Sequence, residues 1–237
     1  MPEPETIFAH VARLLERDRA LEGRQVLVTA GPTREAIDPV RFLSNHSTGK
    51  MGVAIAAAAW RRGANVTLVA GPLSVAPPIG VAHVPVESTE QMRHAVGEHL
   101  SEADVLIMSA APADYRPAET AKRKIKKTGT SRTIELEETP DILLTSRDLR
   151  RAGSVAVGFA LETNDVLANA RRKLEQKALD LIVVNDATEP GAGFAVDTNR
   201  VTLLTRGAAE PEELSLMSKT SVADAILDRV QALLHGR

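Results

Sequence analysis

The chain has 237 residues, of which 43% are hydrophobic and 25% charged, and its formal net charge is -2. Cysteine is absent and aromatic residues make up only 3%. These values exclude a disulfide scaffold, a cysteine-based metal site and a thiol nucleophile. They also give no electrostatic reason to bind nucleic acid. Because the sequence has no leading signal segment and no run of about 18 apolar residues, we expect a cytoplasmic protein that does not enter the membrane.

The first 24 residues differ in pattern from the rest. Apolar residues between Ile7 and Leu15 recur at helical spacing among charged ones, and the pattern ends near Gly23. We predict an N-terminal helix or linker over residues 1–24 and a single domain over residues 25–237, with no internal repeat.

Short apolar runs alternate with helical stretches after this segment. The apolar runs predict strands at residues 25–30, 66–70, 105–109, 155–159, 181–185 and 201–204. The intervening patterns predict helices at residues 50–62, 89–99, 164–177 and 221–234. This alternation is typical of βαβ units, and we predict an α/β fold with a mostly parallel sheet flanked by helices. An alternating stretch at 133–137 predicts a small β arm that protrudes outside that sheet.

Polar loops follow the carboxyl ends of four predicted strands. They occupy residues 31–49, 110–132, 162–164 and 186–199. The first is far longer than the usual connection of about 2–6 residues, and long loops are commonly functional. Because open parallel sheets bind ligands at this edge, we expect a site here.

The first of these loops leads directly into the predicted helix at 50–62. The N-terminus of this helix favours a phosphate group, whereas in an ordinary capped loop Ser47 or Thr48 would cap the helix. The loop matches neither a Walker sequence nor a Gly-x-Gly-x-x-Gly fingerprint. An ordinary capped loop accounts for the cap but not for the polar side chains gathered in one connection, namely Arg34, Asp38, Arg41, Asn45 and Lys50.

Two groups of basic residues have more than one interpretation. Five of the six residues at 122–127 are basic, which fits a solvated edge, a nucleic-acid patch or a lysine that neutralises a nucleotide phosphate. Lys173 and Lys177 share one face of a predicted helix, a pattern more often exposed to solvent than functional. No histidine pair has metal-ligand spacing, so metal ligands stay unknown.

Several motifs together resemble the phosphopantothenate–cysteine ligases, the synthetase part of the bifunctional coenzyme A biosynthesis flavoproteins. The resemblance covers essentially the whole chain. It is carried by VLVTAGPT at 26–33, IDPVR at 37–41, SNHSTGKMG at 44–52, AAPADYR at 110–116, KIKK at 124–127, PDIL at 140–143, GFALET at 158–163, Lys173, Lys177, Asn185, Asp186 and Asn199.

The resemblance implies a Rossmann-like fold and a two-step ligation. CTP activates the carboxylate of 4′-phosphopantothenate as an acyl-cytidylate and pyrophosphate is released. The amine of L-cysteine then displaces CMP, which gives 4′-phosphopantothenoylcysteine for coenzyme A biosynthesis. Splitting one difficult substitution into two easier ones is the general advantage of such an intermediate.

Position by position, the resemblance implies that Asn45 and Lys124 are catalytic and that Arg41 and Asn45 bind substrate. It implies nucleotide contacts at Met108, Ser109, Ala110, Asp114, Lys124, Pro140, Asp141, Ile142, Leu143, Phe159, Lys173 and Lys177. It further implies that Mg²⁺ accompanies CTP, held largely by phosphates and water, and that this domain binds no flavin.

The resemblance also implies a homodimer, to which the arm at 133–137 contributes. It implies fusion to a flavin-dependent decarboxylase domain in a full-length protein, or else a standalone ligase. Two other classes remain to be tested: an NAD(P)-dependent oxidoreductase, disfavoured by the missing glycine fingerprint, and a nucleic-acid module using residues 122–127, disfavoured by the net charge.

Overall fold

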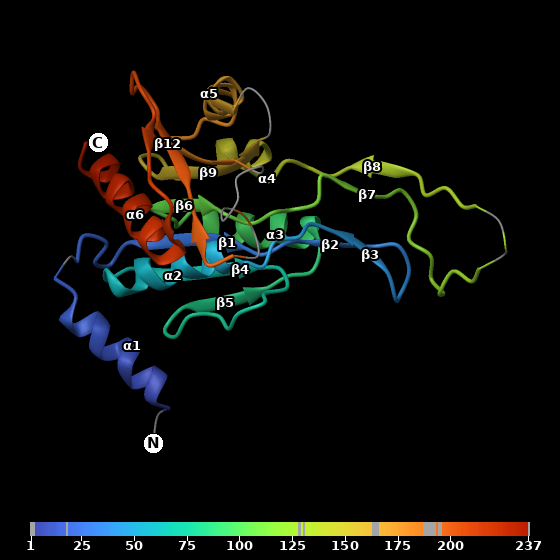
Figure 1. Cartoon of the computed structure of the whole chain (residues 1–237), viewed down its shortest axis with the longest axis horizontal. Helices are drawn as coiled ribbons and strands as arrows, with labels where there is room; N and C mark the ends of the chain where they lie inside the picture. The colour runs from blue at the N-terminus through green and yellow to red at the C-terminus, as the bar shows by residue number, and fades with distance from the viewer. Residues whose placement is uncertain are drawn as a thin grey trace.

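The computed structural model describes residues 3–17, 19–127, 129, 131–162, 166–186, 193 and 196–236. In this part of the chain an eight-stranded sheet has the spatial order β13-β12-β10-β9-β6-β1-β4-β5 (Figure 1). Its strands are β1 (Gln25–Ala30), β4 (Asn65–Ala70), β5 (Ala82–Pro85), β6 (Val105–Met108), β9 (Val155–Glu162), β10 (Leu181–Asp186), β12 (Val201–Thr205) and β13 (Glu212–Glu213). Six neighbouring strands of this sheet run parallel, namely β5, β4, β1, β6, β9 and β10. Strands β12 and β13 add an antiparallel edge. The predicted mostly parallel sheet is therefore confirmed.

Helices cover both faces of the sheet. Successive side chains of a strand point to opposite faces, and here both sets are apolar and are buried under helices. Val26 and Val28 of β1 belong to a buried cluster with α2 and α6, whereas Leu27 belongs to a second cluster with α3, α4 and α5. The helices are α1 (Pro4–Leu15), α2 (Lys50–Arg61), α3 (Thr89–Leu100), α4 (Ile142–Thr145), α5 (Val166–Gln176) and α6 (Lys219–His235), with a 3₁₀ turn η1 (Arg147–Leu149). Both clusters are mainly aliphatic, as the composition predicts.

The order of the strands creates a crevice beside β1. From β1 the chain continues to β4 on one side, whereas β6, β9 and β10 are added on the other side. This is the doubly wound, Rossmann-like order, which places ligands outside the carboxyl ends of the strands where the direction of winding reverses. Backbone pairing between Pro32 and Ala111 continues the contact of β1 and β6 into the loops that follow them.

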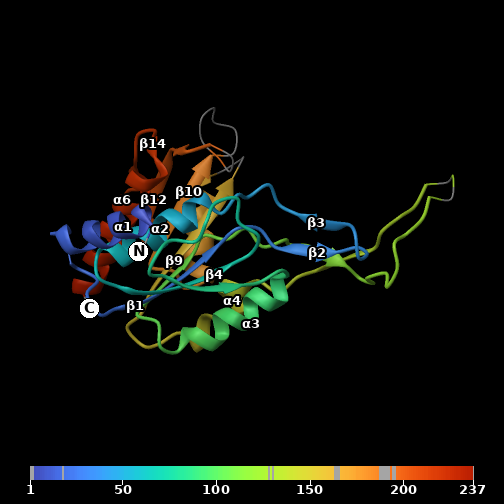
Figure 2. The same cartoon turned by 90° about the horizontal axis from the view of Figure 1, so that it is seen from below.

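Short strands outside the main sheet form an arm that protrudes from the body of the molecule (Figure 2). They pair as β2 (Arg34–Ala36) with β3 (Phe42–Ser44) and β7 (Tyr115–Pro117) with β8 (Leu136–Glu138). The predicted arm is confirmed, but its strand begins at Leu136 rather than at residue 133. A third pair, β11 (Thr198–Asn199) with β14 (Met217–Ser218), lies beside α6.

The predicted N-terminal helix is confirmed as α1, which lies against α2 (Figure 1). Arg13 stacks on the ring of Trp60 at 4.7 Å and donates hydrogen bonds to the carbonyls of Trp60 and Gly63 near the end of α2. The domain boundary at residue 24 stays a prediction. The predicted start of the helix at residues 164 and 165 lies outside the described residues. No helix in the described part of the chain is long and apolar enough to cross a membrane.

Candidate active site

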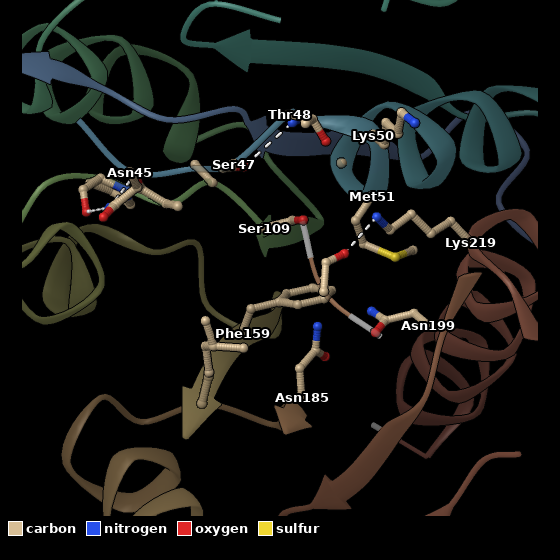
Figure 3. A pocket seen from close by; sticks show the side chains of 18 of the residues that line it. Asn45, Ser47, Thr48, Lys50, Met51, Ser109, Phe159, Asn185, Asn199 and Lys219 are labelled. Carbon is tan, nitrogen blue, oxygen red and sulfur yellow. Dashed lines mark hydrogen bonds between the residues drawn. The ribbon is translucent and has the colours of Figure 1, made fainter. Parts of the chain in front are cut away.

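A cavity of about 340 Å³ opens at the carboxyl edge of the sheet, in the crevice beside β1 (Figure 3). The loop after β1 and the start of α2 form one wall, and the loop after β6 forms another. Phe159 of β9, Asn185 of β10 and Lys219 of α6 complete it. The loops after β1 and β6, predicted to be functional from their length and position, therefore meet in one cleft. Most of the loops predicted at 162–164 and 186–199 lies outside the described residues.

The start of α2 faces this cleft without a side-chain cap. Gly49 is the N-cap residue and adopts a left-handed backbone with φ of 77°. The Oγ of Ser47 accepts only a long hydrogen bond of 3.4 Å from the N–H of Gly49. The alternative of an ordinary capped loop, with Ser47 or Thr48 as the N-cap, is therefore wrong, because the chain turns into the helix through a glycine conformation. N–H groups of a first helical turn have no partner within the helix, so this end suits an anion in the cleft.

Asn45 joins the two loops that form the cleft. Its Nδ2 donates to the carbonyl oxygens of Ala111 and Pro112, each at 3.0 Å. The amide thus fixes the distance between the loop after β1 and the loop after β6. Asn45 also lines the first cavity, and its catalytic role stays a prediction.

A second cavity of about 230 Å³ adjoins the first and shares Phe159 and Asp114 with it. All of the implied nucleotide contacts line it except Ser109, which lines the first cavity, and Lys124. Four separate segments converge there: the loop after β6, the start of α4, the end of β9 and one face of α5. Residues that are distant in the sequence thus form one concave surface.

The two walls of this second cavity are linked by an ion pair. Asp141 caps α4 through Oδ1, which accepts from the N–H of Leu144 at 3.0 Å, and its Oδ2 lies 2.7 Å from Nζ of Lys177. Lys173 lines the same cavity from α5. Both lysines are partly exposed, so an ordinary solvated face stays possible beside the cavity, and their contact with a nucleotide stays a prediction.

Arg41 and Lys124 are not among the described residues that line either cavity. Arg41 lies at the turn between β2 and β3, where its guanidinium binds the carboxylate of Asp38 and the carbonyl of Ile125. The N–H of Ile125 also donates to Asp38, at 3.1 Å. Asp38 therefore holds the segment that carries Lys124 against the base of the arm.

The negative charge of Asp38, at the base of the arm, is strongly stabilised by its neighbours. The Asp38 side chain is fully buried, and Arg41 lies half-exposed beside it. The hydrogen bond from Arg41 lowers the pKa of Asp38 far below its ordinary range, helped by the N–H groups of Ile125, Val40 and Arg41, although burial acts in the opposite direction. Asp38 is therefore ionised at neutral pH, and Arg41 is engaged within its own chain.

Several polar groups lie at the floor of the first cavity, and of these only Ser109 has a role implied by the resemblance. The Oγ of Ser109 and the Oδ1 atoms of Asn185 and Asn199 are buried without a hydrogen-bond partner among the described residues. Lys219 donates from Nζ to the carbonyls of Gly193 at 2.8 Å and Val196. Figure 3 shows these side chains directed into a common space around Phe159.

These buried groups suit a polar ligand. Unsatisfied buried acceptors are unfavourable, so a bound molecule that donates hydrogen bonds to Ser109, Asn185 and Asn199 would be favoured there. Burial lowers the pKa of Lys219, with a smaller contribution from Lys50. Asn185 and Asn199 carry part of the resemblance without an assigned role. Lys219 gives no signal in the sequence, because a lysine near the start of an amphipathic helix is ordinary.

The chain is similar to known proteins over nearly its whole length. Residues 21–234 match the model described as DNA/pantothenate metabolism flavoprotein C-terminal domain. The chain is 44% identical over 236 residues to the coenzyme A biosynthesis bifunctional protein CoaBC of Vibrio vulnificus strain YJ016, covering 99% of this chain and 58% of that protein. It is 45% identical to CoaBC of Bacillus subtilis strain 168, covering 98% of this chain and again 58% of the relative.

A solved structure agrees with both matches. The crystal structure of the C-terminal domain of CoaBC is 42% identical, has a TM-score of 0.79 and covers 92% of this chain and 100% of that one. The chain spans somewhat more than half the length of the full CoaBC proteins. The chain belongs to the family of the DNA/pantothenate metabolism flavoprotein C-terminal domain.

Proposed function

We propose that the chain joins 4′-phosphopantothenate to L-cysteine with CTP as the activating nucleotide. One observation carries this proposal: the implied nucleotide contacts, scattered from Met108 to Lys177 in the sequence, line one cavity beside the cleft that contains Asn45. CoaBC relatives are named for coenzyme A biosynthesis, which is where this ligation belongs.

The proposed reaction has two balanced steps. A carboxylate oxygen of phosphopantothenate attacks the α-phosphorus of CTP, and the bond to pyrophosphate breaks. The amine of cysteine then attacks the acyl carbon, CMP leaves with the electrons of the broken C–O bond, and the proton of the amine passes to solvent. Each step builds negative charge on a phosphate, which preorganised cations and N–H groups stabilise.

In this proposal, different parts of the two cavities bind the phosphates and the acyl group. The uncapped start of α2 is placed to receive phosphate oxygens, and Lys173 and Lys177 supply positive charge in the second cavity. Asn45, bound to the carbonyls of Ala111 and Pro112, holds the acyl group at the junction of the two cavities. Most of the rate enhancement then comes from orientation and charge stabilisation rather than from proton transfer by a histidine.

Mg²⁺ enters this proposal with the nucleotide. Among the described residues no group of three acidic or histidine side chains is arranged to hold a metal ion. Asp141, which lines the nucleotide cavity, already caps α4 and pairs with Lys177. Phosphate oxygens and water would therefore supply most of the ligands, as is usual for this ion. Mg²⁺ would reduce the negative charge of the triphosphate.

The positions of Arg41 and Lys124 support a homodimer in this proposal. Both are implied to contact substrate, yet both lie on the arm and line neither cavity of their own chain. A second copy would place the arm of one chain over the cleft of the other. Fusion to a decarboxylase domain in a longer protein and a cytoplasmic location stay predictions beside it.

A four-component assay tests the proposed function. Pyrophosphate and CMP are measured with the full chain, Mg²⁺, phosphopantothenate, cysteine and either CTP or ATP, and each component is omitted in turn. We expect pyrophosphate release that requires phosphopantothenate, CMP release that requires cysteine as well, and faster turnover with CTP. Pyrophosphate release independent of phosphopantothenate would overturn the proposal, and tight NADPH binding in a parallel titration would favour the oxidoreductase alternative.

A further inference from the structure

Arg150 occupies an unusual position behind the nucleotide cavity. It follows η1 in the chain, does not line the cavity, and is half-buried. Its Nη1 donates to the carbonyls of Lys177 at 3.0 Å and Ala178 at 3.1 Å, and its Nη2 donates to the carbonyl of Leu143 at 2.6 Å. One guanidinium thus binds the backbones of both cavity walls.

The segments joined by Arg150 are weak by themselves. The helix α4 has only four residues, too few to be stable without tertiary contacts. The helix α5 ends at Gln176, and Ala178, two residues later, has a left-handed backbone with φ of 48°, a conformation that disfavours residues with a Cβ. Arg150 compensates at this end, since a cation at a helix C-terminus interacts favourably with the exposed carbonyls.

The other link between the two walls depends on a residue that is implied to bind the nucleotide. Lys177 pairs with Asp141 at 2.7 Å, so a nucleotide that attracts Lys177 weakens this ion pair. The hydrogen bonds of Arg150 use backbone carbonyls and remain available in the bound state. They therefore keep α4 and α5 at a fixed separation when the nucleotide competes for Lys177.

We propose that Arg150 is a positioning residue for nucleotide binding, which acts by holding the α4 and α5 walls of the cavity together. This inference rests on the proposed function, because it assigns the second cavity to the nucleotide. The guanidinium is half-buried, and its Nε has no hydrogen-bond partner among the described residues. Burial also lowers the pKa of Arg150 from its ordinary value. A lysine has no planar fork and does not reproduce all three bonds.

The test compares Arg150→Met with Arg147→Met in the full chain. Arg147 lies three residues earlier, is exposed and pairs only with its neighbour Asp148 among the ion pairs of the described residues, so it is a matched control. We expect Arg150→Met to raise the Kd for CTP and the KM for CTP by about tenfold, as for loss of charge-assisted hydrogen bonds. The KM for cysteine should stay unchanged, Arg150→Lys should be intermediate, and Arg147→Met should resemble the wild type.

A stability control separates positioning from simple support of the fold. Ala178→Gly removes the strain of the left-handed position and restores stability to the Arg150→Met chain. Weak CTP binding that persists in this double variant, with a melting temperature close to wild type, supports the inference. Recovery of CTP binding together with stability would overturn it. Unchanged binding in Arg150→Met would overturn this inference alone, whereas failure of the wild type to bind CTP would overturn the proposed function and this inference with it.

Discussion

At the scale of single residues, Asp38 organises the base of the arm. One of its carboxylate oxygens accepts from the N–H groups of Val40 and Arg41, each at 2.9 Å. The other accepts from the Arg41 guanidinium and from the N–H of Ile125. The buried charge is stabilised by this full set of donors, which explains the low pKa of Asp38. The carboxylate therefore links the loop after β1 to the basic segment that carries Lys124.

This arrangement predicts a specific dependence of stability on pH. A carboxyl group whose pKa is lower in the folded state stabilises the protein above its unfolded pKa, about 3.9 for aspartate, and this contribution is lost as pH falls towards the folded value. Asp38→Asn should therefore lower the melting temperature at pH 7, and the difference from wild type should shrink as the pH falls below about 4. Glu90→Gln, which breaks an exposed pair with Arg93, should change little at either pH. A difference for Asp38→Asn that is equal at pH 7 and pH 3 would contradict this account.

At the scale of secondary structure elements, close packing of α2 on β1 sets the position of the helix N-terminus in the cleft. A Cβ added at Gly52 would lie 2.5 Å from the Cβ of Ala30 and 2.8 Å from the carbonyl oxygen of Thr29. Gly52 therefore allows the first turn of α2 to contact the strand directly. By contrast, a Cβ at Gly97 in α3 would meet no atom within 4 Å.

These two helical glycines predict opposite effects of the same substitution. Gly52→Ala should destabilise the protein by about 1–3 kcal/mol through overpacking and weaken nucleotide binding, because the start of α2 must move away from β1. Gly97→Ala should stabilise it by about 0.5–1 kcal/mol, since alanine favours the helix and has space. Urea unfolding and CTP titration of both variants check this. A Gly52→Ala chain with wild-type stability and affinity would show that the close contact does not position α2.

At the scale of the whole molecule, the arm carries a set of apolar side chains that are exposed to solvent in the single chain. They lie on or beside the strands of the arm and include Val40, Phe42, Tyr115, Ile134 and Leu136. Exposed apolar groups clustered on one protrusion are typical of interaction surfaces. Since Arg41 and Lys124 lie on the same arm, dimerisation through it would also bring these two residues to the cleft of a partner.

This arrangement predicts that Lys124 acts across the dimer. Lys124→Gln should reduce turnover by about a hundredfold or more while the melting temperature is unchanged, whereas Lys122→Gln in the same basic run should have little effect. A chain without the arm that still sediments as a dimer would contradict the role of the arm in dimerisation.

Mixing two inactive chains then distinguishes action within one chain from action across the dimer. One chain carries Lys124→Gln and the other Asn45→Ala, and the two are unfolded and refolded together. If Lys124 serves the partner's cleft, each mixed dimer contains one intact site, and about a quarter of wild-type turnover should return. If no activity returns although mixed dimers form, Lys124 acts within its own chain.

Much of the fold and part of the site follow from local sequence patterns. Buried parallel strands such as β1 and β6 appear as continuous apolar runs, and their predicted ends agree with the structure within one residue. Short elements such as β5 and α4 carry too few residues to show a period, so their positions depend on neighbours. For a related reason the sequence does not identify Gly49 as the N-cap of α2, because its left-handed turn leaves no distinct pattern in the sequence.

Patterns in the sequence are enough to predict an aliphatic α/β domain, the edge of its sheet where a site is expected, and the motifs that imply a ligase. Which polar residues meet depends on the tertiary structure. Arg150 donates to the carbonyl of Lys177, which lies 27 positions away, and the Lys177–Asp141 pair spans 36 positions of chain. Such contacts arise from the packing of α4 and α5 on the same sheet face, which no local pattern encodes. The tertiary structure also placed Arg41 and Lys124 together on the arm, where they line neither cavity, because Asp38 binds both segments there.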